Sequence, residues 1–183
     1  LTVDEIQHVM EAYGAKEISF WDDTFSGDPQ WTIEMCKEIK RRGLKIVWSC
    51  YCNILGTSEE MLTHMAEAGC WNIFYGIESG NEDLLLKMRK GLRLDKIREI
   101  VKHTKKVGIE IRGSFMLGVP GETPEKGMNT IKFAIELDPD YAQFSICTPY
   151  PGTELWDIAQ REGKIINTDY TKYQGWDPVW VPE

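Results

Sequence analysis

Short apolar runs alternate with amphipathic segments along almost the whole chain, and this alternation is the strongest constraint on its fold. The sequence predicts strands at residues 17–22, 45–52, 70–77, 109–117 and 141–147, and helices at residues 3–13, 30–42, 57–68, 82–89, 94–107, 124–137 and 154–162. Strands that alternate with helices every ~25 to 35 residues form a parallel sheet with right-handed crossovers. We therefore expect an α/β protein, either an open doubly wound sheet or a barrel.

The two ends of the chain depart from this alternation. The first helical segment has no strand before it, so we expect one βα unit to be missing from the front, and the start at Leu1 agrees with a fragment or a processed product. Residues 1–163 are expected to form the core. Residues 164–183 contain Tyr173, Trp176 and Trp180 but show no periodicity, so we expect a C-terminal tail whose aromatic side chains pack on the protein.

Residues 113–123 read as a buried strand that enters a tight turn and then a helix. The strand half is apolar, as expected for a parallel strand covered on both faces. Gly118, Pro120 and Gly121 shape the turn, Glu122 lies at its mouth, and Thr123 is the expected N-cap of the next helix. Ligands of α/β proteins bind at this position, although a plain strand–helix connection fits the stretch equally well.

Each predicted strand ends in a polar or turn-forming cluster. The clusters are Asp22, Asp23 and Thr24; Tyr51, Cys52 and Asn53; Glu78 and Ser79; Gly118, Gly121 and Glu122; and Thr148 and Tyr150. In a parallel barrel these side chains converge on one rim. Carboxylates there suit an amine or ribose hydroxyls, and glycines let the backbone approach a flat ring. Asp22 and Asp23 also fit a turn or a divalent-metal pair, and Glu78 also fits the start of a helix.

Composition argues against several classes of function and location. The net charge of −8 argues against a general nucleic-acid surface, which needs clustered Lys and Arg. No apolar run approaches membrane-spanning length, and no signal-peptide pattern is present. The five cysteines are an odd number without the pattern of a small secreted domain, so we expect a reduced, cytoplasmic setting and structural roles for the thiols. His8, His64 and His103 fall on helices and are expected to face solvent.

Taken together, the strand ends resemble the radical S-adenosylmethionine (SAM) superfamily, in particular its cobalamin-domain-associated branch. The matching stretches are residues 20–25, 68–71, 74–80, 113–123, 138–144 and 148–153. They follow the order of the family and cover nearly the whole chain. One such motif is weak evidence, whereas five in register, with residues 138–144 and 148–153 counted as one, are strong.

The resemblance implies a partial (β/α)6 TIM-like barrel of the radical SAM type, with strands two to six present and SAM lying across the strand ends. It implies that Asp22, Asp23 and Thr24 contact the methionine amino group, and that Glu78, with Ser79 beside it, holds the ribose hydroxyls. The adenine is expected against Met116, Gly118 and Glu122, flanked by Thr148. These nine residues are the expected cofactor-binding set.

The resemblance also implies an activity and its partners. The family cleaves SAM reductively to a 5′-deoxyadenosyl radical, with methyl transfer or hydrogen abstraction on a small-molecule substrate. It implies a 4Fe–4S cluster, a reductant such as flavodoxin or ferredoxin, and cobalamin held by an upstream domain.

One defining feature of the family is absent from the sequence. Its Cys-x-x-x-Cys-x-x-Cys motif, which holds three irons of the cluster, does not occur, and Cys50, Cys52 and Cys70 lack the spacing. We therefore expect the cluster ligands to lie upstream and the chain alone to be inactive, with no metal ligands of its own. The alternatives are a (β/α)-barrel lyase or aldolase that uses a divalent ion, and a scaffold domain that lost the cluster.

Overall fold

The protein is described by a computed structural model that covers residues 1–182. Its main sheet contains β1 (Glu17–Ser19), β2 (Val47–Cys52), β3 (Cys70–Glu78), β4 (Glu110–Leu117) and β5 (Tyr141–Ile146). All neighbouring strands are parallel and their spatial order is the order in the chain. The sheet is therefore a parallel half-barrel, and the expected α/β partial-barrel fold is confirmed.

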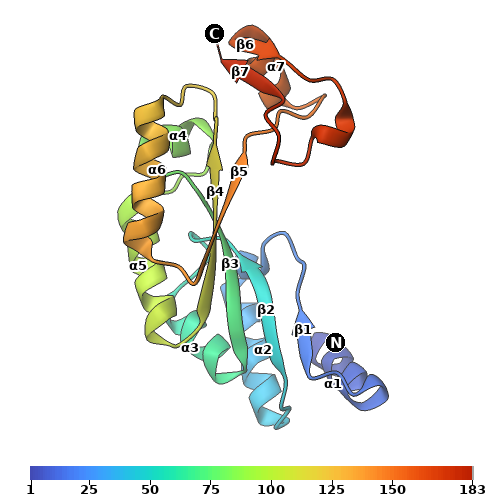
Figure 1. The fold of residues 1–183 in the computed structure, drawn as a ribbon. Coiled ribbons are helices and arrows are strands. Elements are labelled where there is room, and N and C mark those ends of the chain that lie inside the picture. The colour runs from blue at the N-terminus through green and yellow to red at the C-terminus, as the bar shows by residue number, and fades with distance from the viewer. Residues whose placement is uncertain (183) are drawn as a thin grey trace.

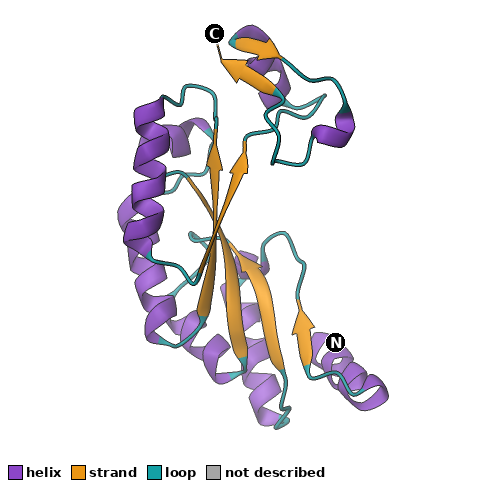
Figure 2. Ribbon diagram, in the orientation of Figure 1, coloured by secondary structure: helices purple, strands orange, loops and turns teal. Residues whose placement is uncertain are grey.

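The helices are α1 (Thr2–Tyr13), α2 (Pro29–Arg41), α3 (Glu59–Glu67), α4 (Glu82–Lys87), α5 (Leu94–Lys106), α6 (Pro124–Leu137) and α7 (Glu154–Arg161), with 3-10 turns η1 (Phe25–Gly27) and η2 (Tyr170–Lys172). Helices between the strands cover one face of the sheet, whereas α1 precedes β1 and α7 lies beyond the strand ends (Figures 1 and 2). Side chains cap three of the longer helices at their start: Asp28, Ser58 and Thr123 accept hydrogen bonds from backbone N–H groups of the first turn.

The core lies between the sheet and this helical layer. In β2 the alternate residues Trp48, Cys50 and Cys52 are buried, whereas Ser49 and Tyr51, which point to the other face, are half-buried. A strand places successive side chains on opposite faces, so this pattern shows that the helices cover one face only. The carboxyl ends of the strands lie at the end of the sheet where α4 and α7 are found (Figure 1).

Two predicted segments differ from the structure. The sequence predicts the first strand over residues 17–22, but β1 ends at Ser19. The N–H of Phe20 still donates to Ser49 O at 2.8 Å, after which residues 21–24 leave the sheet. Aromatic packing of Phe20 on Phe25 and Trp48 explains this turn away from the ladder, since it draws the chain toward the core.

The C-terminal segment contains regular structure that the sequence does not reveal. β6 (Gly163–Ile165) pairs antiparallel with β7 (Trp180–Pro182), and both contact α7. Tyr173 and Trp180 are buried, as expected for packed aromatic side chains, whereas Trp176 is 62% exposed. Among residues 1–182, none of the helices combines the length and the apolar character needed to cross a membrane.

Candidate functional site

The loop after β1 presents two carboxylates to solvent. Asp22 and Asp23 are exposed, and among residues 1–182 neither carboxylate forms a hydrogen bond or an ion pair. Thr24 directs its hydroxyl back to Asp23 O at 2.8 Å, and Trp21 packs on Tyr51 with ring centroids 5.4 Å apart. The loop therefore offers unpaired negative charge, which suits a ligand ammonium group.

Glu78 ends the central strand in an unusual backbone conformation. Its φ is +68°, a left-handed value that costs a residue other than glycine roughly 1–2 kcal/mol, and the pairing of β3 with β4 shifts register between Gly76 and Glu78. Oε1 of Glu78 accepts a hydrogen bond from Nζ of Lys90 at 2.9 Å, and the glutamate side chain is only 12% exposed. Strain of this kind concentrates at functional sites, which marks Glu78 as a candidate.

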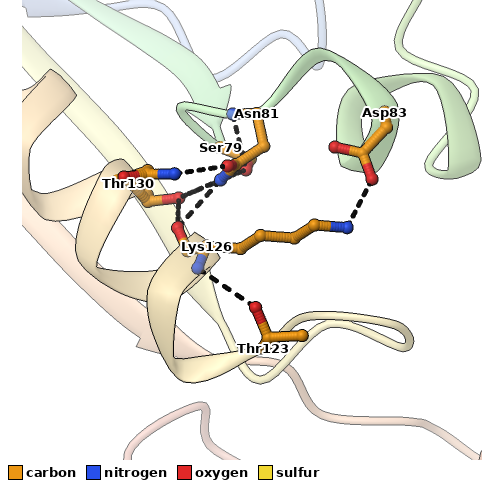
Figure 3. Close-up of polar contacts among 7 residues, drawn as sticks. Ser79, Asn81, Asp83, Thr123, Lys126 and Thr130 are labelled. Atoms are coloured by element: carbon orange, nitrogen blue, oxygen red, sulfur yellow. Dashed lines mark hydrogen bonds and ion pairs between the residues drawn. The ribbon is translucent and has the colours of Figure 1, made fainter.

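Ser79 lies in a different position from the expected one. Its side chain is fully buried, and its hydroxyl lies 3.2 Å from the hydroxyl of Thr130 on α6. Asn81 completes the network by donating to Lys126 O at 2.8 Å and to Thr130 Oγ1 at 3.2 Å (Figure 3). Because its hydroxyl is used inside this network, Ser79 fixes the loop after β3 to α6 and is not presented to a ligand.

The β4–α6 turn has the shape expected from its glycines. Gly118 and Gly121 have φ values of +77° and +80°, which glycine adopts without strain. The N–H of Gly118 donates to the carboxylate of Glu122, and the N–H of Glu122 donates to Val119 O at 2.9 Å. Burial raises the pKa of the Glu122 carboxyl above its ordinary value, although the Gly118 N–H opposes this shift.

A cavity of about 520 Å³ lies beside this turn. Its apolar wall is formed by Met88, Met116, Val119, Cys147, Leu155 and Ile158. Lys87 and Arg89 lie at the same cavity, and Arg89 forms a 2.8 Å ion pair with Glu154 of α7. Size and apolar lining are those of a small-molecule site. Of the nine expected residues, only Met116 lines the cavity. Thr148 directly follows the cavity residue Cys147; it is half-buried, and its hydroxyl donates to Ile146 O at 3.0 Å.

The cysteines do not form a cluster site. All five are buried and free, and within residues 1–182 no group of three or more His, Cys, Asp or Glu side chains is arranged to hold a metal ion. Burial raises the pKa of the Cys36 and Cys147 thiols to about 12, so these thiols stay protonated. A 4Fe–4S cluster is held by several Cys thiolates placed around it, and because no such arrangement exists among the described residues, they do not fit this cluster.

Sequence reasoning misses Lys90 and Gly76. An isolated glycine inside a predicted strand signals a bulge or a close approach, and Gly76 is such a residue, so this signal is available. Nothing in the sequence marks Lys90, because its meeting with Glu78 depends on how the chain turns after α4.

A sequence model of the radical SAM superfamily matches residues 1–134. An uncharacterised methyltransferase of Pyrococcus horikoshii is 40% identical over 97% of this chain and 39% of its own length. Bacteriochlorophyllide d C-12(1)-methyltransferase of Chlorobaculum tepidum is 26% identical over the whole chain and 40% of its own length. The chain thus spans about two fifths of both relatives.

Several solved structures are similar in fold. One of them is the radical S-adenosylmethionine methyltransferase TsrM of Kitasatospora setae, determined with cobalamin and a [4Fe-4S] cluster bound. The match has a TM-score of 0.78 at 23% identity, over 87% of this chain and 31% of that one.

Proposed function

Because the chain belongs to the radical SAM superfamily, we propose that it forms the SAM-binding part of a radical SAM enzyme. The family expected from the strand-end motifs is confirmed by the match over residues 1–134. The observation that carries the proposal is the pairing of β3 with β4, which puts Glu78 opposite Phe115 on the strand that ends in the turn of Gly118 and Glu122.

The proposed contacts divide SAM into three parts. Asp22 and Asp23, with Thr24, bind the methionine ammonium, since their carboxylates are exposed and unpaired among residues 1–182. Glu78 accepts hydrogen bonds from the ribose hydroxyls. The adenine lies against the β4–α6 turn and the cavity beside it, in contact with Met116, Gly118, Glu122 and Thr148. Ser79 holds the loop of Glu78 in place through the α6 network.

The redox centre is proposed to be bound elsewhere. The described residues do not fit a 4Fe–4S cluster, so we place its ligands in the polypeptide outside this chain. When bound, such a cluster supplies the electron that cleaves SAM; this chain orients SAM and limits the access of water. The proposed division between residues 1–163 as core and 164–183 as tail is retained, although β6 begins at Gly163 and pairs with β7.

The names of the relatives support a proposal for the reaction class. Several of them are named as methyltransferases, and the TsrM structure contains cobalamin. We infer methyl transfer to a small-molecule substrate, assisted by cobalamin on an accompanying domain. A flavodoxin or ferredoxin is the proposed reductant, and the cytoplasm the proposed compartment, because all five cysteines are free.

The test compares the full-length protein with residues 1–183. Both are reconstituted with iron and sulfide without oxygen, given SAM and a reductant, and assayed for 5′-deoxyadenosine and S-adenosylhomocysteine. We expect products from the full-length protein only, with a loss of at least tenfold in Glu78→Gln. Glu99→Gln, which changes an exposed glutamate on α5, is the matched control. A folded, reducible full-length protein that neither binds SAM nor forms either product contradicts the proposal.

A further inference from the structure

The ion pair between Glu78 and Lys90 lies directly beside Gly76, where a Cβ atom would otherwise be. A Cβ atom at Gly76 would lie 2.7 Å from Oε1 of Glu78 and 3.3 Å from Nζ of Lys90. Real Cβ atoms essentially never come within 2.7 Å of another atom, so a side chain at residue 76 would displace the flexible ends of Glu78 and Lys90 from their present positions. Gly76 and Glu78 of β3 and Lys90, which follows α4, therefore lie in contact with one another.

Lys90 is presented to Glu78 by the end of α4. The N–H of Lys90 donates to Leu85 O at 3.0 Å, and the N–H of Arg89 donates to Leu86 O at 2.9 Å. These two bonds and the left-handed φ of Arg89, +55°, make a Schellman motif. Such motifs usually have glycine at the left-handed position, so the backbone before Lys90 is held in a conformation that arginine disfavours.

Strained backbone therefore occurs at one partner, Glu78, and at the residue directly before the other. Within residues 1–182, left-handed φ values outside glycine occur at Glu78, Arg89 and Asp138; Glu78 is a member of this ion pair, and Arg89 directly precedes its partner Lys90. Two independent strained positions that converge on one 2.9 Å contact indicate that its geometry matters. The bond uses Oε1, and no hydrogen bond to Oε2 is found among the described residues, so Oε2 is available to a ligand.

We propose that Lys90 is a positioning residue that orients the Glu78 carboxylate toward a ribose diol, a role that rests on the proposed function. With Oε1 held by Lys90, the carboxylate cannot rotate freely and Oε2 meets the hydroxyl groups in a fixed direction. Without Lys90, a carboxylate that is only 12% exposed lacks its cation and turns toward water. Lys90 thus acts on the ligand through Glu78 and gives preference for a nucleoside with both hydroxyl groups.

The test measures this preference by binding, independently of turnover. Calorimetric titration of the reconstituted full-length protein with 5′-deoxyadenosine and with 2′,5′-dideoxyadenosine gives a ratio of dissociation constants. We expect the wild type to favour the diol about tenfold. In Lys90→Met the ratio falls to about twofold or less, and Lys90→Arg restores most of it. Lys96→Met is the matched control. The side chain of Lys96 is 36% exposed, close to the 37% of Lys90, and it likewise pairs with a glutamate, Glu99, at 3.0 Å.

A second variant distinguishes a loss of the Glu78–Lys90 geometry from a folding defect of Lys90→Met. Gly76→Ala keeps both charges but places a methyl group against Oε1, and we expect it to lower the ratio as Lys90→Met does. If the wild type shows the preference and both variants retain it, the inference is wrong while the proposed function stands. If the wild type binds neither nucleoside, the proposed function is wrong, and the inference, which rests on it, is wrong as well.

Discussion

The buried hydroxyl groups of Ser79 and Thr130 lie 3.2 Å apart and join the loop after β3 to α6. Thr130 also accepts from the N–H of Gly80 at 3.1 Å, so its removal leaves several buried polar groups without a partner. We expect Thr130→Val, which keeps the shape, to lower the free energy of unfolding by ~1–3 kcal/mol in urea titrations. Thr63→Val is the control, since Thr63 likewise bonds the carbonyl four residues earlier but lies on the outer surface of α3. Equal losses in the two variants would show that the loop network adds nothing.

The elements of this fold are predictable from the sequence, and their tertiary relationships are not. Hydrophobic periodicity and caps such as Ser58 locate helices and strands within a few residues. The end of β1 cannot be predicted from local sequence because Phe20 packs on Trp48, a residue 28 positions later in the chain. The buried position of Ser79 cannot be predicted for the same reason, since its partner Thr130 follows 51 positions later.

The candidate site is predictable as a set of strand ends but not as a geometry. Glu78 is identified from its place after an apolar strand, and the turn at Gly118 from its glycines. The ion pair with Lys90 depends on left-handed backbone at two residues other than glycine, which sequence propensity predicts against. Strained positions are where local rules are expected to fail.

Two glycines that follow helices should differ in their tolerance of a methyl group. Gly43 and Gly69 both have positive φ, +66° and +94°. A methyl group added at Gly43 would have nothing within 4 Å, whereas at Gly69 it would collide with the carbonyl oxygen of Ile46, which belongs to rigid backbone. We expect Gly43→Ala to cost about 1 kcal/mol of unfolding free energy and Gly69→Ala at least ~3 kcal/mol. Urea denaturation of both variants measures the difference, and similar midpoints would contradict the clash.

The Glu122 carboxyl should make stability depend on pH. Burial raises its pKa in the folded protein above the ordinary value of 4.5, so the folded state holds this proton more tightly than the unfolded state. The stabilisation of the folded protein by the protonated Glu122 carboxyl is complete below pH 4.5 and is lost as the pH rises through the folded pKa. Glu122→Gln mimics the neutral acid and keeps an acceptor for the Gly118 N–H. We expect the variant and the wild type to have the same melting temperature at about pH 4. As the pH rises to about 7, we expect the melting temperature of the variant to rise above that of the wild type. A melting-temperature difference independent of pH would contradict this assignment.

The C-terminal segment should depend on one tryptophan. Trp180 is 5% exposed, and its indole N–H donates to Cys147 O at 3.2 Å, which ties β7 to the end of β5. Removing a buried indole typically costs ~3–5 kcal/mol, so we expect Trp180→Ala to release residues after α7 to a protease in limited digestion. Trp176→Ala is the control, because Trp176 is 62% exposed and its loss removes little packing. Equal protection of both variants would show that β6 and β7 are held by contacts other than the Trp180 indole.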